Sequence, residues 1–148
     1  MDEAVRSTLR LAPDASGAQR TIDITTYGAR SGAPRRIEIW FHYVDGRWYL
    51  TGSPGRRDWY ANLRADPRLI VHLKRSVRAD LPASARPITD SAERRAVFEP
   101  ILAWLRSPGC GGVAPRSVYA TFVSGPDQAR IAGRPGQVAQ AAWAPSVP

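Results

Sequence analysis

The chain has 148 residues, of which 43% are hydrophobic, and this length supports one folded domain with a single core rather than two. No apolar run is long enough to cross a membrane and no apolar leader is present, so we expect a soluble, cytoplasmic protein with no transmembrane segment. The net charge of +8 is carried almost entirely by arginine and predicts an anionic partner: nucleic acid, a phosphorylated cofactor, an acidic substrate or a membrane surface.

The cysteine and histidine content excludes two classes of site. Cys110 is the only cysteine, which rules out an internal disulfide and a cysteine metal cluster. His42 and His72 lie far apart in sequence, with no third ligand at a metal-binding spacing. We therefore expect no metal site and interpret both histidines as packed or rim residues of strands.

The first predicted elements are three strands. Residues 21–26 and residues 37–44 show the two-residue alternation of half-buried strands. Asp45 and Gly46 then supply the pair that a type I′ turn favours, and residues 47–52 return as the partner strand. This part of the chain therefore predicts a β-hairpin preceded by one further strand.

A short helix is predicted next, beginning at about Pro54. Ser53 suits its N-cap, Pro54 suits the first helical position, and Trp59 and Leu63 share a face because they are four residues apart. Pro67 ends the run.

Two strands and a second helix follow. Residues 69–73 and residues 77–88 are predicted strands, and Pro82 places the second of them at an edge or a bulge. Asp90 and Glu93 have the spacing of a capping box and predict the start of a helix.

The last part of the chain changes in composition. Pro100 predicts a kink or a division in the second helix, and residues 117–123 read as a final strand. The Pro, Gly and Ala content of residues 125–148 predicts a flexible tail, so residues 1–124 form the expected single domain. Strands joined mainly by turns, with few helices between them, favour an antiparallel sheet closed into a small barrel with helices outside it.

Arginines concentrate in residues 28–36, a connection between strands that contains no acid. The start of the first predicted helix adds free amides, the positive end of the helix dipole and two more arginines. Antiparallel pairing of the parent strands brings both segments to one end of the sheet. The residues expected in this anion site are Arg30, Ser31, Arg35, Arg36, Ser53, Arg56 and Arg57. These residues indicate a cleft for a phosphate or a polycarboxylate, and they do not specify the ligand any further.

Two motifs together carry a resemblance to a known family. The first is TTYGARSGAPR, residues 25–35, before an aromatic-rich strand, and the second is WYANLRADPR, residues 59–68, which follows Ser53-Pro54-Gly55. This combination resembles the deazaflavin (F420)-dependent nitroreductase family, which belongs to the flavin/deazaflavin oxidoreductase superfamily of split β-barrels. The similarity covers residues 21–88, over half of the expected domain.

The resemblance implies a mainly β (α+β) fold: an antiparallel six-stranded split β-barrel, FMN-binding-like, with two or three flanking helices. It implies an oxidoreductase that transfers a hydride from reduced coenzyme F420 to a quinone, a nitro compound or an activated alkene. The coenzyme's tail is a phosphodiester followed by carboxylates, which an acid-free arginine loop suits. By position, the resemblance assigns Arg30, Ser31 and Arg35 to the tail, with Arg36 a weaker match, Ser53, Pro54 and Gly55 to the ring, and Trp59 and Asn62 to the helix facing the cofactor.

The chain also departs from the family pattern. Ala29 stands where a second basic residue is usual, Glu38 lies where apolar residues are common, and the segment after Ser53 is shorter than in the family. The C-terminal tyrosines that line the substrate pocket in the best-known member of the family have no evident counterpart, so neither a proton donor nor another catalytic residue is assigned.

Three alternatives remain open from the sequence. The nearest is the same fold with FMN, whose phosphate the basic end would hold. The second is a single-strand-binding β-barrel, although the arginines lie at loop and helix starts and do not alternate with aromatics on one strand. The third is a barrel that holds a small apolar ligand or catalyses a tailoring step in a biosynthetic pathway without net reduction. We expect a small-molecule hydride acceptor as the partner, no nucleic acid, and a monomer or homodimer.

Overall fold

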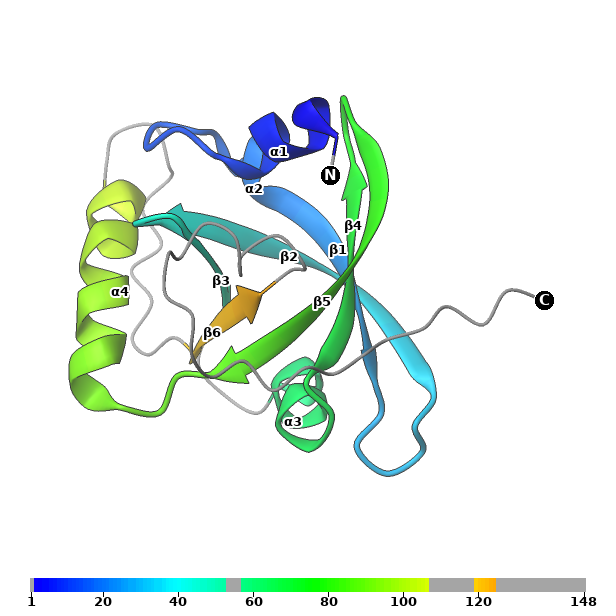
Figure 1. The fold of residues 1–148 in the computed structure, drawn as a ribbon. Helices are drawn as coiled ribbons and strands as arrows, with labels where there is room; N and C mark the ends of the chain where they lie inside the picture. Colours follow the sequence, from blue (N-terminus) through cyan, green and yellow to red (C-terminus); the bar gives the residue numbers. More distant parts are fainter. Residues whose placement is uncertain (1, 53–56, 107–118, 125–148) are drawn as a thin grey trace, which may run out of the picture.

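The computed structural model describes residues 2–52, 57–106 and 119–124 of the chain. The described residues form a mainly β domain with helices around it (Figure 1). In chain order the elements are α1 (Glu3–Leu9), α2 (Gly17–Arg20), β1 (Thr21–Tyr27), β2 (Pro34–Val44), β3 (Arg47–Gly52), α3 (Asp58–Ala65), β4 (Arg68–Lys74), β5 (Arg78–Pro87), α4 (Ser91–Leu105) and β6 (Tyr119–Ser124).

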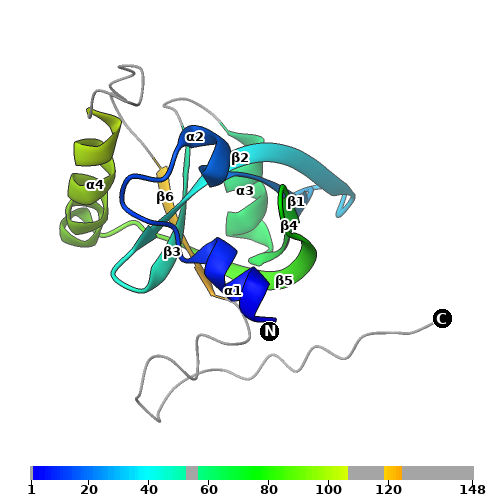
Figure 2. The ribbon, with the colours of Figure 1, turned by 90° about the horizontal axis from the view of Figure 1, so that it is seen from above.

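The described strands form one closed antiparallel barrel in the order β1-β2-β3-β6-β5-β4 (Figures 1 and 2). Three neighbouring pairs join strands that follow one another in the chain with no helix between them, namely β1–β2, β2–β3 and β4–β5. The last strand, β6, lies between β3 and β5, and β1 pairs with β4 to close the barrel. The antiparallel, split-barrel-like fold with flanking helices that the sequence predicts is therefore confirmed.

The β2–β3 hairpin forms as its turn residues predict. Asp45 has a φ of 49° and Gly46 a φ of 76°, so both central residues occupy the left-handed region that a type I′ turn requires. The turn sets the register in which Val44 pairs with Arg47 and Phe41 with Leu50. This register places Phe41 and Leu50 together inside the barrel, where both are buried.

Two helices cover opposite ends of the barrel, α1 at the top and α3 at the bottom of Figure 1. Val5 and Leu9 of α1 and Trp59 and Leu63 of α3 belong to the same buried cluster as the inward-facing strand residues. The four-residue spacing of Trp59 and Leu63 therefore places both side chains against the core, as the sequence predicts. Each helix closes one end of a single core.

The longest helix, α4, lies outside the barrel (Figure 1). It packs Val97 and Ile101 against Tyr49 of β3 and Ile88, which form a second buried cluster. Its N-terminus has the predicted cap, because the Asp90 side chain accepts a hydrogen bond from the Glu93 amide at 2.8 Å.

Some predicted boundaries are wrong. Helix α3 begins at Asp58 and not at Pro54, because Arg57 is extended at φ −125° and makes no side-chain cap. The first strand connection comprises residues 28–33, since β2 begins at Pro34, so Arg35 and Arg36 lie on a strand. Helix α4 continues through Pro100 and is not divided there. The predicted residues 53–56 and the tail 125–148 lie outside the described residues.

The N-terminal helices were missed by the sequence analysis because α1 has 7 residues and α2 only 4, too few to show helical periodicity. Capping residues gave a usable signal, since Ser16 and Gln19 form a complete capping box at α2. Pro82 is paired with Ile70 of β4 on one side, and β6 pairs only with residues 84–87, so Pro82 occupies a locally unpaired edge as expected. Among the described helices, none is long and apolar enough to cross a membrane.

Candidate functional site

A groove of about 670 Å³ lies between the end of the β1–β2 hairpin and helix α3. It brings together six of the residues that the sequence assigned to an anion or cofactor site: Arg30, Ser31, Arg35, Arg36, Trp59 and Asn62. Its other walls come from Thr26, Gly28, Ala29, Pro34, Ile37, Asp58 and Ala61. Segments that are about thirty residues apart in the chain therefore meet at one end of the barrel, as antiparallel pairing predicts.

The loop at the hairpin end is held by its own backbone. The Gly28 amide donates to the Ala33 carbonyl at 2.9 Å, and the Gly32 amide donates to the Gly28 carbonyl at 2.8 Å. Gly32 has a φ of 67°, which favours glycine, and a Cβ at Gly28 would come within 2.5 Å of the Ser31 hydroxyl oxygen. That oxygen accepts a hydrogen bond from the Ala33 amide at 3.2 Å, so the Ser31 O–H remains able to donate to a ligand.

Asn62 joins α3 to this loop. Its side-chain oxygen accepts a hydrogen bond from the Ala29 amide at 3.0 Å, and its amide nitrogen donates to the Thr26 hydroxyl at 3.1 Å. The side chain is buried, so both bonds are shielded from water. Asn62 therefore positions the loop, and its polar atoms are already used by the protein.

Trp59 is a packing residue with one edge at the groove. It is 7% exposed, and a Cβ at Gly52 would come within 2.9 Å of its ring. Its ring also meets that of Tyr60 edge to face, with centroids 5.8 Å apart. The other tryptophans of the barrel are engaged as well: Trp48 donates to the Leu9 carbonyl at 2.9 Å, and Trp40 packs against Trp104.

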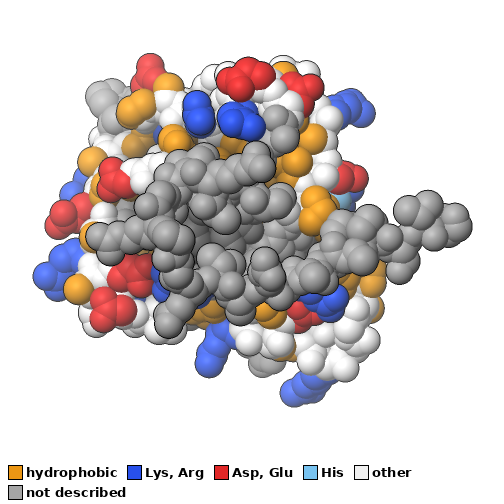
Figure 3. All heavy atoms as spheres, viewed as in Figure 1, with side chains coloured by type: hydrophobic (Ala, Val, Ile, Leu, Met, Phe, Trp, Pro, Cys, Tyr) orange, Lys and Arg blue, Asp and Glu red, His pale blue; other side chains and the backbone are white. Residues whose placement is uncertain are grey.

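Two arginines of the groove have no acidic partner in the part of the chain that the structure describes. Arg30 and Arg35 are exposed, and neither forms an ion pair with any described residue. In Figure 3, Lys and Arg side chains project from the lower edge, where Figure 1 places α3 and the end of the β1–β2 hairpin. Along the left edge, acidic and basic side chains are mixed. The hairpin end therefore presents positive charge that no described residue neutralises.

Arg36 differs from these two arginines, because successive side chains of a strand point to opposite faces. It lies on the outer face of β2, and its Nε donates to the Asp23 carboxylate at 3.0 Å. Lys74 contacts the same carboxylate at 2.5 Å and also donates to Glu38. Burial alone would raise the pKa of Asp23, but hydrogen bonds from Lys74 and Arg36 outweigh it and hold this pKa below its ordinary value. Arg36 is thus already neutralised.

One acid was missed by the sequence analysis. Asp58, the first residue of α3, is exposed and lines the groove opposite the hairpin. Its place in the first helical turn is favourable to the helix dipole. Arg57, directly before it, is exposed and does not line this groove, and Ser53, Pro54, Gly55 and Arg56 lie outside the described residues.

A buried polar chain runs beneath the end of β3. Nε2 of His42 lies 3.0 Å from the Thr51 hydroxyl, and Nδ1 lies 3.4 Å from the Arg20 guanidinium. Burial, reinforced by the charge of Arg20, lowers the pKa of His42 to about 3. We therefore assign a neutral ring whose Nδ1 accepts from Arg20 and whose Nε2–H donates to Thr51. Thr51 is the second residue before the predicted ring-contacting segment at 53–55.

The other histidine, His72, forms contacts that join neighbouring strands. Nδ1 of His72 lies 2.5 Å from the Asp80 carboxylate, and Nε2 lies 2.8 Å from the Thr25 hydroxyl. Thr25 and His72 are both buried on the outer face of the barrel, so this chain links β5, β4 and β1. The described residues contain no group of three or more His, Cys, Asp or Glu side chains arranged to hold a metal ion.

Comparison with known proteins identifies the family. A family model described as F420H(2)-dependent quinone reductase matches residues 10–106, about two thirds of the chain. The chain belongs to this family. The resemblance to F420-dependent reductases inferred from the two motifs is confirmed, and the protein is an F420-dependent oxidoreductase by family.

Solved structures resemble the fold at low sequence identity. A conserved hypothetical protein from Mycobacterium tuberculosis is 15% identical with a TM-score of 0.59, covering 95% of this chain and 94% of that one. HutZ, a heme storage protein from Vibrio cholerae, is 12% identical with a TM-score of 0.54, covering 84% and 89%. A structure described as a domain-swapped dimer is 20% identical with a TM-score of 0.52, covering 82% and 94%. These likenesses establish the fold alone.

Proposed function

We propose that the groove between the β1–β2 hairpin and α3 binds the anionic tail of reduced coenzyme F420. We further propose that the protein transfers a hydride from this coenzyme to a small electron-poor acceptor, such as a quinone, a nitro compound or an activated alkene. The observation that carries the proposal is the pair of unneutralised arginines, Arg30 and Arg35, in a groove of a chain that belongs to an F420-dependent family.

The groove fits a phosphate and carboxylate tail in its donor set. Arg30 and Arg35 offer planar forks suited to bidentate contacts with such anions, and the Ser31 hydroxyl has a proton left to donate. Arg36 contributes less, because Asp23 already neutralises it. Asp58 repels a tail that lies close to α3 and thereby favours the hairpin side of the groove.

The remaining candidates divide into two roles. Asn62 and Trp59 shape the groove from behind, since both are buried and engaged with the protein. Ser53, Pro54, Gly55, Arg56 and Arg57 remain proposed contacts for the ring end, which follows β3 in the chain. The bound coenzyme supplies the hydride, and the chain's contribution is binding and placement.

The test is a fluorescence titration of the purified protein with oxidised F420 and, separately, with FMN. We expect saturable F420 binding that weakens by about tenfold or more in Arg30→Ala and in Arg35→Ala, because each removes a charged bidentate donor. Arg95→Ala is the matched control, since Arg95 is exposed on α4, away from the groove.

Each other outcome changes the assignment. Tighter binding of FMN than of F420 would keep the fold and replace the cofactor. Binding of neither, or equal weakening in all three variants, would reject the groove as a cofactor site. Once F420 binding is shown, single-turnover oxidation of reduced F420 by a quinone, a nitroaromatic and an activated alkene identifies the acceptor class.

A further inference from the structure

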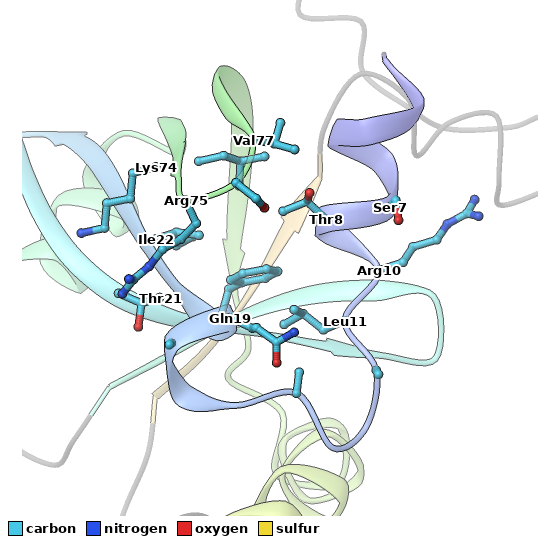
Figure 4. A pocket seen from close by; sticks show the side chains of 16 residues that line it. Ser7, Thr8, Arg10, Leu11, Gln19, Thr21, Ile22, Lys74, Arg75 and Val77 are labelled. Atoms are coloured by element: carbon cyan, nitrogen blue, oxygen red, sulfur yellow. The ribbon is translucent and has the colours of Figure 1, made fainter.

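A second cavity, of about 460 Å³, lies at the other end of the barrel, between α1, α2 and the turn from β4 to β5 (Figure 4). Strand β1 runs between the two sites: Thr26, near its C-terminal end, lines the groove, whereas Thr21 and Ile22, at its start, line this cavity. At the rise of an extended strand, those ends are roughly 13 Å apart. A ligand here is therefore separate from the groove proposed for the coenzyme tail.

The floor of the cavity is apolar. Ile22, Phe41 and Leu73 contribute buried side chains from β1, β2 and β4, and Leu11 and Val77 add half-buried walls. The volume falls within the range of sites that take small organic ligands. These walls would accept a short hydrocarbon chain or a single ring.

The charge at the rim is positive. None of the described residues that line the cavity is acidic, whereas Arg10, Lys74 and Arg75 are basic. The Lys74 ammonium is already met by Asp23 and Glu38, and the Arg10 side chain turns away from the cavity in Figure 4. Arg75 also lines the cavity: its side chain runs alongside Ile22 toward Thr21 in the same view, and it forms no ion pair with a described residue.

The polar side chains that line the cavity include a further donor. The Gln19 side-chain oxygen accepts from the Ser16 amide at 2.8 Å, which leaves its NH₂ group available to a ligand. The hydroxyls of Thr8 and Thr21 already donate to the carbonyls of Ala4 and Gly17. The cavity therefore combines an unneutralised guanidinium and a free amide donor at its rim with an apolar floor.

We propose that this cavity is a second ligand site, which binds a small carboxylate carrying an apolar chain. One guanidinium fork matches the two oxygens of a carboxylate, and the floor removes the chain from water. Because Arg75 is exposed, its contact is partly screened, and most of the affinity comes from the apolar chain.

The test uses sodium octanoate as the probe, with butanoate and neutral octanamide for comparison, in calorimetric titrations of the full chain. Octanoate is expected to bind roughly tenfold or more tightly than butanoate, because four additional methylenes are buried. Octanamide is expected to bind roughly fivefold more weakly than octanoate, and Arg75→Gln to remove that difference. Arg95→Gln makes the same substitution on α4 and is expected to leave octanoate binding unchanged.

Two further measurements locate the site. Octanoate is expected to shift the side-chain NH₂ signals of Gln19 in ¹H–¹⁵N spectra and to leave the Ala29 amide unchanged. Arg35→Ala is expected to leave octanoate binding unchanged and Arg75→Gln to leave F420 binding unchanged, so either site can fail without the other. Absence of binding up to about 10 mM octanoate, equal affinity for octanoate and octanamide, or loss of binding in Arg35→Ala would overturn the proposal.

Discussion

Arginines serve two different purposes in two regions of this barrel. Between α2, β2 and α4, Arg20 is 4% exposed, donates to the Ala15 and Pro13 carbonyls, and lies 3.9 Å from the Trp104 ring centroid. At the hairpin end, Arg30 and Arg35 are exposed and have no acidic partner among the described residues. The comparison shows that a high arginine content is not itself a binding signal. What distinguishes the arginines proposed to bind a ligand is that no described residue pairs with them.

The largest expected effect concerns the structural region. Arg20→Met keeps much of the side-chain volume but leaves the carbonyls of Ala15 and Pro13 without their donor. We expect the free energy of unfolding to fall by about 3 kcal/mol, measured by urea denaturation. Arg95→Met on exposed α4 is the control and is expected to change stability by about 0.5 kcal/mol or less. A loss no greater than in the control would show that Arg20 is not structural.

The same region gives a pH dependence through His42. Its folded pKa, about 3, lies below the ordinary value of 6.5, so the unfolded chain binds the proton first as the pH falls. The free energy of unfolding therefore decreases as the pH falls from 6.5 toward 3. The decrease reaches about 1.4 kcal/mol per pH unit where His42 is protonated in the unfolded chain and neutral in the folded one. Between pH 6.5 and 5 the loss is about 1.5 kcal/mol. Unfolding free energies of the wild type and of His42→Gln over this interval test it, since the variant should lack this slope.

Asn62 stands at the border of the binding region, because it is buried but holds the loop that carries Arg30. Asn62→Ala removes its bonds to the Ala29 amide and the Thr26 hydroxyl, and we expect a loss of about 1.5 kcal/mol in unfolding free energy. F420 affinity should fall as well, through the displaced loop.

A double-mutant cycle separates these contributions. Thr26→Val removes only the hydroxyl partner, so its coupling to Asn62→Ala should be about 1 kcal/mol. Additive effects of the two substitutions on stability would contradict the hydrogen bond between them.

The sequence predicted the elements whose signals are local. Asp45-Gly46 specified its hairpin, the Asp90 cap specified the start of α4, and alternation specified the barrel strands. The start of α3 was predicted four residues too early, because Ser53 and Pro54 have the composition of a cap while the helix begins at Asp58. Helix propensity shows only which structure a residue tolerates. The position of this helix is decided by the tertiary packing of Trp59.

The sequence did not show which side chains form ion pairs or hydrogen bonds across the barrel. Arg35 and Arg36 are adjacent, identical in type and both border the groove, yet only Arg36 pairs with an acid, Asp23, thirteen residues away in the chain. Arg20 gave no signal either, because its acceptors are backbone carbonyls. The acid-free composition of residues 28–36 predicts an anion site but overlooks Asp58, which lines the same groove from another element.

The smallest expected effect comes from comparing Arg35 with its neighbour Arg36. Arg35→Ala is expected to leave the free energy of unfolding unchanged within about 0.5 kcal/mol while weakening F420 binding, because no described residue depends on its charge. Arg36→Ala is expected to do the reverse, with a loss of about 0.5 kcal/mol in the free energy of unfolding and little change in F420 affinity. The loss is small because the Arg36 side chain is 54% exposed and solvent screens its ion pair with Asp23. Stability at low and high salt sharpens the contrast, because only the Arg36 contribution should diminish as ions screen it. Equal loss of F420 binding in both variants would mean that the ion pair between Arg36 and Asp23 opens when the ligand binds. An ion pair in the ligand-free protein would then no longer distinguish a structural arginine from a binding one.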